Sequence, residues 1–124
     1  MSVNVPTSID LLAKARLLEE RWQPHVVAEL NDYQFKVARL KGGFVWHDHP
    51  DTDEAFLVLE GQLRIDLPSG AVHLGPGELF VVPAGMQHNP HADEDTLVVL
   101  IEPRGVRNTG SAGGERTAEQ DRWI

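Results

Sequence analysis

The chain has 124 residues, of which 41% are hydrophobic, and this length and composition are typical of one globular domain. Its 19 acidic and 11 basic residues give a net charge of −8, which argues against nucleic acid and membrane surfaces as partners. Because the chain has no cysteine, disulfides and thiolate metal ligands are excluded. Residues 1–10 do not resemble a signal peptide, and the apolar runs are too short to span a membrane, so we expect a cytoplasmic protein.

A short amphipathic helix is predicted in the N-terminal segment, residues 1–24. Thr7 is expected as its N-cap, with Asp10 three residues further on. Apolar side chains then repeat at helical spacing: Leu11, Ala15, Leu18 and Trp22. Pro24 ends the pattern, which predicts a helix packed against the outside of the fold.

Short strands are predicted throughout the next segment, residues 25–102. They cover residues 25–30, 33–40, 44–49, 55–59, 62–67, 71–74, 78–82, 88–92 and 96–101. Glycine- and proline-rich turns separate most of them, and the acidic run 93–95 is expected as the last turn. Closely spaced short strands indicate an all-β barrel or sandwich.

The C-terminal tail, residues 103–124, is rich in glycine, threonine, serine and charged residues, a composition typical of a loose segment. Its last two residues are Trp123 and Ile124. Since two large apolar side chains are costly to leave in water, we expect the tail to dock on the barrel or on a partner.

Candidate metal ligands gather around residues 47–54. In a strand over residues 44–49, His47 and His49 lie on one face, because side chains alternate with period two. Pro50 begins a tight turn, and Glu54 opens the next strand, so its carboxylate can return to the histidine face. Two imidazoles and a carboxylate are most of a site for a divalent transition metal, which needs at least one further ligand.

Two motifs contain the candidate ligands. The first has the pattern His-x-His, then a Glu and a Gly, formed by His47, His49, Glu54 and Gly61. The second has the pattern Gly, Pro-x-Gly and His, formed by Gly77, Pro83, Gly85 and His88. Together they resemble the two motifs of the cupin superfamily, and in particular small single-domain cupins with a cupin type-2 domain, similar to mannose-6-phosphate isomerase domains. Ala92 departs from the pattern, since the family places an asparagine there.

The resemblance implies a double-stranded β-helix, or jelly-roll barrel, with the short helix and the tail outside it. It also implies a divalent metal held by four side chains: His47, His49, Glu54 and His88. Three imidazoles and one carboxylate suit Fe, Mn, Ni, Zn or Cu and leave one or two coordination positions open. The remaining histidines, His25, His73 and His91, are expected to be bystanders.

Several side chains around the metal motif have an expected orientation. Phe44 and Trp46 alternate with the histidines and should face away from the metal. Lys36 and Arg39 occupy opposite faces of one strand, so one of the two can point into the barrel. Candidates for lining a pocket are Phe35, Val45, Phe56, Val58, Leu79, Val82 and Met86. Outward apolar side chains such as Leu57 and Leu59 need cover, and small cupins are commonly homodimers, so we expect a homodimer.

Three functions are consistent with these features, and each takes a small organic molecule in the barrel. The first is a metal-dependent enzyme, such as an oxygenase, and the second is a non-catalytic module that binds a sugar or a carboxylate. The third is isomerisation of a sugar phosphate, which Asp48, Asp51 and Asp53 disfavour because their charge repels a phosphate dianion. The sequence identifies no catalytic residue beyond the metal ligands.

Overall fold

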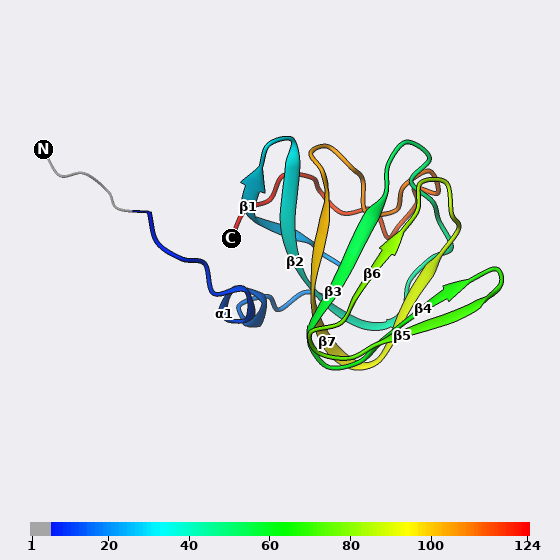
Figure 1. Ribbon diagram of the computed structural model, residues 1–124, viewed down its shortest axis with the longest axis horizontal. Coiled ribbons are helices and arrows are strands. Elements are labelled where there is room, and N and C mark those ends of the chain that lie inside the picture. Colours follow the sequence, from blue (N-terminus) through cyan, green and yellow to red (C-terminus); the bar gives the residue numbers. More distant parts are fainter. Residues whose placement is uncertain (1–5) are drawn as a thin grey trace, which may run out of the picture.

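Residues 6–124 are described by a computed structural model of the chain (Figure 1). This part contains a short helix and seven strands: α1 (Leu11–Arg16), β1 (His25–Leu30), β2 (Tyr33–Gly43), β3 (Glu54–Glu60), β4 (Leu63–Leu67), β5 (Gly70–Leu74), β6 (Leu79–Val82) and β7 (Asn89–Pro103). The strands form one antiparallel sheet that curls into a barrel. The predicted all-β jelly-roll class is therefore confirmed. No helix among residues 6–124 is long and apolar enough to cross a membrane.

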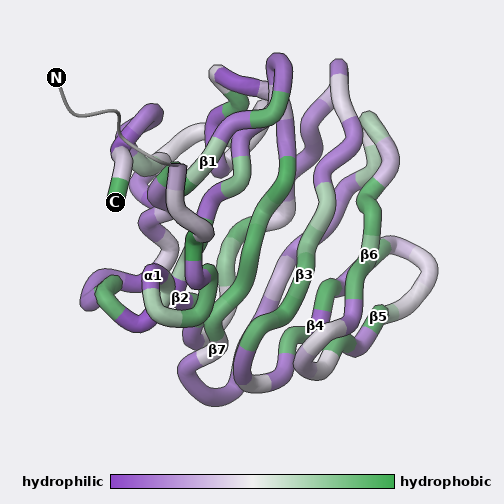
Figure 2. The backbone as a smooth tube through the Cα atoms, turned by 60° about the vertical axis from the view of Figure 1, so that its left-hand side comes forward, coloured by the Kyte–Doolittle hydropathy of each residue, from purple (hydrophilic) through white to green (hydrophobic). Residues whose placement is uncertain are grey.

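The long strand β7 holds the barrel together. The main path of the sheet runs β1-β2-β7-β3-β6, so the C-terminal half of β7 is flanked by β2 and β3. The N-terminal half of β7 pairs with β4, and β4 forms a hairpin with β5. Hydrophobic residues dominate the strands and hydrophilic residues dominate the turns at their ends (Figure 2).

The acidic run 93–95 lies inside β7 and does not form the turn that the sequence predicts. Aspartate is depleted in strands because its charge and short side chain favour turns. Here the Asp95 carboxylate accepts a hydrogen bond from Arg21 at 2.8 Å and lies 3.8 Å from the Arg39 guanidinium. These two cations compensate the charge and allow the backbone to continue as one strand.

Residues 44–49 form an extended loop in place of the predicted strand. The loop is tied to the start of β7 by an isolated bridge between His47 and His88, with N–H···O distances of 3.0 and 2.9 Å. Nearer β2, the Phe44 amide donates to the Pro90 carbonyl at 3.1 Å. Because proline has no N–H to return, a continuous ladder cannot form at this point.

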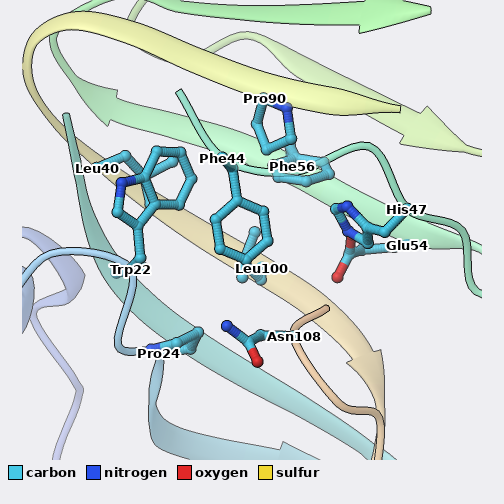
Figure 3. A pocket seen from close by; sticks show the side chains of 11 residues that line it. Trp22, Pro24, Leu40, Phe44, His47, Glu54, Phe56, Pro90, Leu100 and Asn108 are labelled. Atoms are coloured by element: carbon cyan, nitrogen blue, oxygen red, sulfur yellow. The ribbon is translucent and has the colours of Figure 1, made fainter. Parts of the chain in front are cut away.

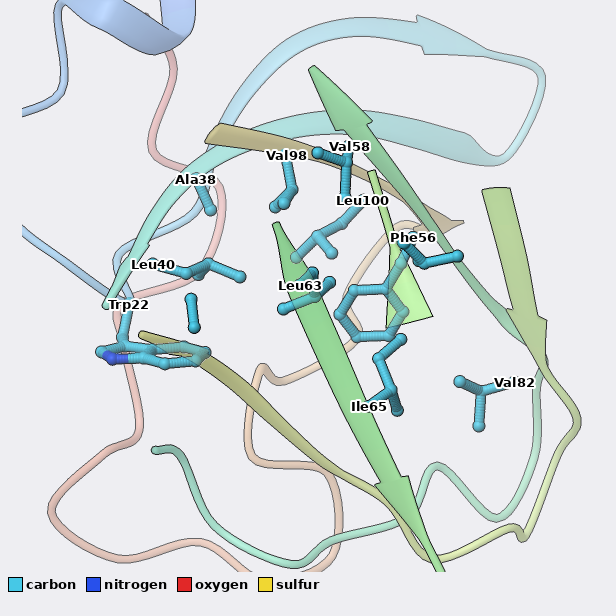
Figure 4. Packing of buried hydrophobic residues seen from close by; sticks show 12 residues of the cluster. Trp22, Ala38, Leu40, Phe56, Val58, Leu63, Ile65, Val82, Val98 and Leu100 are labelled. Atoms are coloured by element: carbon cyan, nitrogen blue, oxygen red, sulfur yellow. The ribbon is translucent and has the colours of Figure 1, made fainter. Parts of the chain in front are cut away.

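Alternation along the strands divides the buried side chains into two clusters. The inner cluster fills the barrel and contains Trp22, Ala38, Leu40, Phe56, Val58, Leu63, Ile65, Leu74, Val82, Ala92, Val98 and Leu100 (Figure 4). The outer cluster lies beneath α1 and contains Ala15, Leu18, Val27, Val37, Leu97 and Val99. Leu57 and Leu59 pack against the outer cluster, so the cover expected for them comes from the chain itself.

The helix is shorter than predicted and begins later. Its N-cap is Asp10, whose carboxylate accepts the Ala13 amide at 3.0 Å, so the predicted Thr7 cap is wrong. The helix ends at Arg16, and Trp22 lies beyond it at φ 61° with its indole Nε1–H donating to the Lys41 carbonyl at 2.9 Å. Trp22 therefore belongs to the barrel interior and not to an outer helical stripe.

The tail docks on the barrel, as its terminal residues predict. The Val26 amide of β1 donates to the Arg122 carbonyl at 2.6 Å, and the Ile124 amide donates back to Val26 at 3.1 Å. Ile124 packs against the outer cluster, whereas Trp123 stays 54% exposed. The tail has no helix or strand of its own, so its path is set by contacts with the rest of the chain.

Candidate metal centre

The four predicted ligands meet at one end of the barrel. One ligand atom from each of His47, His49, Glu54 and His88 lies within 4.8 Å of every other, and all four side chains are buried. Both histidines of the first motif come from the loop over residues 44–49, Glu54 opens β3, and His88 precedes β7. The bridge between the backbones of His47 and His88 brings the two motifs together.

Hydrogen bonds orient two of the imidazoles. His47 Nδ1–H donates to the Val45 carbonyl at 2.8 Å, and His88 Nδ1–H donates to the Met86 carbonyl at 2.9 Å. These partners assign the proton to Nδ1 and leave the Nε2 lone pair of each ring free. Metal-binding histidines commonly use this arrangement, in which the second ring nitrogen is held by a carbonyl or a carboxylate.

Two buried nitrogens in the cluster have no hydrogen-bond partner among the described residues: His49 Nε2 and His88 Nε2. They lie 3.3 and 3.5 Å from the same oxygen of Glu54. Since a buried polar atom without a partner is costly, this arrangement needs something to satisfy it. A metal ion between the three imidazoles and the carboxylate would do so, and the donor set suits a divalent transition metal.

The protonation states also suit a metal. Burial, reinforced by the nearby His88, lowers the pKa of His47 from 6.5 to about 4, so its imidazole is neutral at pH 7. Burial alone would raise the pKa of Glu54, but close contacts with Glu102, His49 and His88 outweigh it and hold that pKa well below its usual range. At neutral pH the cluster therefore offers a neutral imidazole and an ionised carboxylate, the forms that bind a cation.

A second buried acid, Glu102, lies beside Glu54. The register that pairs Ala55 with Ile101 places the two glutamates opposite each other on β3 and β7. Lys36 Nζ donates to Glu102 Oε1 at 2.8 Å, and both side chains are almost fully buried. Burial and the charge of Glu54 raise the pKa of Glu102 well above its usual range, although Lys36 opposes this shift.

Lys36 is thus the cation that points into the barrel, whereas Arg39 lies on the other face and donates to the Leu18 carbonyl at 2.7 Å. Strand alternation in the sequence pointed to Lys36, but Glu102 was not predicted. Glu102 could have been found because it lies two residues beyond Leu100, a member of the inner cluster, and therefore takes an inward position on an apolar strand.

An apolar pocket opens beside the cluster (Figure 3). Its lining consists of Trp22, Pro24, Ala38, Leu40, Phe44, His47, Glu54, Phe56, Pro90, Leu100 and Asn108. The space inside is narrow, about 30 Å³. Asn108 comes from the C-terminal tail, which the sequence did not connect with the site.

The orientation predicted for Phe44 is wrong. Its ring stacks on Trp22 with centroids 4.7 Å apart and meets the His47 ring edge-on at 5.4 Å. The prediction assumed a regular strand over residues 44–49, and the loop found there rotates Phe44 into the pocket. Trp46 does point away and is 47% exposed.

Of the seven residues predicted to line a pocket, Phe56 does so. Val58 and Val82 are buried elsewhere in the inner cluster, and Phe35 packs against the outer one. Leu79 and Met86 are exposed, and Val45 is half-buried. Alternation places a side chain inside or outside the barrel but does not tell which inward residues border a cavity.

The other histidines lie outside the cluster, as predicted. His25 Nδ1 is 2.8 Å from the Gln23 carbonyl, and His91 Nε2 is 2.8 Å from an Asp93 oxygen. His73 is exposed on β5. Ala92 is buried in the inner cluster, so no polar group stands at the position where the family pattern has an asparagine.

Comparison with solved structures supports the fold. A cupin-2 domain-containing protein from Shewanella frigidimarina superposes with a TM-score of 0.76 at 46% identity, over 77% of this chain and 94% of that one. A hydroquinone 1,2-dioxygenase, PnpCD, solved in complex with Cd²⁺ and 4-hydroxybenzonitrile, shares the fold with a TM-score of 0.69 at 17% identity, over 85% of this chain and 82% of that one.

Sequence comparison points the same way. The uncharacterised protein YdbB of Bacillus subtilis (strain 168) is 33% identical over 75% of this chain and 83% of its own length. Acireductone dioxygenase of Leishmania braziliensis is 28% identical over 98% of this chain, which spans about half of that protein (46%). Residues 36–104 match the Cupin domain family. With both motifs assembled at the end of a β-barrel, the chain belongs to the cupin superfamily.

Proposed function

We propose that this cupin is a metal-dependent enzyme, in which His47, His49, Glu54 and His88 hold a divalent transition metal for oxidation of a small organic molecule. The observation that carries the proposal is the pair of buried, unpartnered nitrogens on His49 and His88, both directed at Glu54 at the end of an apolar pocket. When bound, the metal supplies a Lewis-acidic or redox-active centre with open coordination positions.

The residues around the cluster have distinct roles in this proposal. Trp22 and Phe44 cover the pocket side of the centre and exclude water from it. Glu102, anchored by Lys36, lies against Glu54 and holds its carboxylate in place. The Val45 and Met86 carbonyls fix two imidazoles with Nε2 free.

The pocket favours an apolar substrate over a sugar phosphate. Apart from the two ligands His47 and Glu54, Asn108 is its polar lining residue within the described part of the chain, and no cation lines it. A phosphate dianion needs cationic or N–H donors, and a sugar needs several hydrogen-bonding groups. The narrow space also requires the lining side chains to move for a ligand of more than a few atoms. The lining of this pocket therefore gives little support to a function like that of mannose-6-phosphate isomerases.

Two relatives support oxygen chemistry on small molecules. One is named an acireductone dioxygenase, and the other is a hydroquinone dioxygenase that was solved with a metal and a small aromatic molecule. The proposed substrate class is accordingly a small molecule with a diol, a phenol or a keto acid group at the metal end and an apolar remainder.

Oxygen consumption tests the proposal and separates it from a non-catalytic module that binds a sugar or carboxylate. Protein prepared without an affinity tag is loaded with Fe(II) and then with each other candidate metal, and oxygen uptake is followed with phenols, diols and keto acids. Uptake that disappears in His49→Ala and persists in His73→Ala, an exposed histidine outside the cluster, is the expected result. Metal binding without uptake under any of these conditions would favour the non-catalytic module.

We also propose a homodimer. Leu79 and Val81 of β6 are 55% and 46% exposed, and they pair across the sheet with Leu57 and Ala55 of β3. β6 is the last strand on the main path of the sheet, and an apolar sheet edge is a site where a second copy can pack. Light scattering coupled to size-exclusion chromatography tests this, and a monomer at micromolar concentration would contradict it.

A further inference from the structure

The C-terminal tail lies beside the candidate metal centre, although it is outside the part of the chain that matches the family. The match ends at residue 104, and the tail beyond it contacts the loop and the pocket next to the candidate ligands. Residues 108–111, which we name the strap, lie against the loop that carries His47 and His49. Asn108 begins the strap and lines the pocket next to Leu100 and Phe44 (Figure 3).

The strap is fastened to the backbone of the histidine loop. The Ser111 amide donates to the Asp48 carbonyl at 3.1 Å, and the Ser111 hydroxyl donates to the Asp48 carboxylate. Asp48 stands between the two histidines of the first motif, so these bonds hold the segment that carries both.

Gly110 makes the closest approach. Its φ of +55° lies in the left-handed region, and a Cβ on it would overlap the Asp48 carbonyl oxygen and stand 3.1 Å from His49 Nδ1. Only glycine therefore allows the strap backbone to pack this closely on the Asp48 carbonyl. The same packing brings the strap next to the His49 ring on its Nδ1 side.

The strap is also rigid in itself. The Arg107 guanidinium donates twice to the Gly110 carbonyl, at 2.9 and 2.6 Å. The Asn108 amide closes a loop within the tail, donating to the Arg116 carbonyl at 2.9 Å and accepting the Ala118 amide at 2.8 Å. Thr109 is fully buried. A segment held in this way can act as a fixed wall.

His49 differs from the other two histidines in how its ring is held. Backbone carbonyls accept from Nδ1 of His47 and of His88, whereas no such bond reaches the His49 ring from the described residues. Its backbone is anchored, because the Gly85 amide donates to the His49 carbonyl at 2.9 Å, but this bond leaves the ring free to rotate. The Gly110 backbone lies on the Nδ1 side of this ring, where a Cβ on it would stand 3.1 Å from Nδ1.

We propose that the strap is a positioning element for the metal, which fixes the His49 ring by contact and thereby sets the affinity and geometry of the centre. This inference rests on the proposed metal site. It assigns a role in that site to a segment outside the family match, and it names Gly110 and Ser111 as its positioning residues.

Gly110→Ala tests the proposal against a matched glycine. Gly113 also has a left-handed φ, +64°, but a Cβ there meets only the end of the Arg107 side chain, at an ordinary 3.6 Å. Both substitutions impose a similar backbone cost, and only the first presses on the histidine loop. The two variants are titrated with Co²⁺ and Zn²⁺, and the visible absorption spectrum of the Co²⁺ form is recorded at saturation.

We expect Gly110→Ala to weaken metal binding by about 10- to 100-fold and to change the Co²⁺ spectrum, as loss of a ligand's outer support generally does. Gly113→Ala should bind as the wild type does. Should Gly110→Ala fail to fold, Ser111→Ala carries the test and is expected to weaken binding in the same direction.

Two results would overturn the strap's role: wild-type affinity and spectrum in the variants at 110 and 111, or an equal loss in Gly113→Ala. Failure of the wild type itself to bind either ion would instead overturn the proposed metal site, so the two failures are distinguishable.

Discussion

Glu54 and Glu102 face each other on neighbouring antiparallel strands, and both side chains are buried. Two buried carboxylates side by side cannot both stay ionised without compensation. The contacts of Glu54 with the histidines favour its ionised form, whereas burial favours the protonated form of Glu102. A protonated Glu102 can donate to Glu54 while it accepts from Lys36, and this makes Lys36 essential to the arrangement.

Lys36→Met should therefore destabilise the metal-free protein strongly. The substitution removes the donor to Glu102 and the cation nearest to the ionised Glu54, and leaving a buried acceptor unsatisfied costs about 1–3 kcal/mol. The double variant Lys36→Met with Glu102→Gln should recover much of the loss, because the unpaired acid is gone. Urea unfolding of the wild type, both single variants and the double variant measures this, and equal stabilities for the single and double variants would contradict it.

The stability of the metal-free protein should fall in mild acid because of His47. The pKa of His47 is about 4 in the folded chain and about 6.5 when unfolded, so between these values the unfolded state binds more protons. The contribution of His47 to the free energy of unfolding is fully present above pH 6.5. It is lost as the pH falls towards 4, by up to about 3 kcal/mol. Urea unfolding at several pH values measures the slope, which His47→Gln should flatten.

Metal should stabilise the folded state through the four ligands. A metal at 100 times its Kd adds about 2.7 kcal/mol, which raises the melting temperature by several degrees. Glu54→Gln keeps the shape of the side chain but removes its charge, and should abolish most of this gain. The control is His73→Ala, which lies outside the cluster. Calorimetry with and without metal, followed by a chelator, distinguishes the two variants.

Gly61→Ala should destabilise the barrel more than the same change at another glycine. Gly61 has φ +96°, and a Cβ there would stand 2.5 Å from Thr96 Oγ1 and 3.0 Å from the Thr96 backbone. Strain in this region costs about 1–3 kcal/mol before the clash is counted. Gly70 has φ +148° and open space around it, so Gly70→Ala is the control for the cost of placing a side chain on a backbone with positive φ. Equal losses of unfolding free energy would show that the Thr96 contact is unimportant.

Local pattern in the sequence predicted most of the barrel. Alternating apolar residues placed six strands almost as found, since alternation reports directly which side chains face a core. Two predictions failed for identifiable physical reasons. Pro90 prevents a ladder along residues 44–49, and distant cations allow the acidic run 93–95 to continue as a strand.

The sequence by itself determined the barrel and the four residues of the candidate metal centre, because His47, His49 and Glu54 are close along the chain and the second motif adds His88. Only the tertiary structure decided what surrounds them. Glu102 reaches Glu54 through the register of two strands that are far apart in sequence. Gly110 reaches His49 through the path of a tail without regular structure. Such contacts depend on register and on loop path, neither of which leaves a periodic pattern in the sequence.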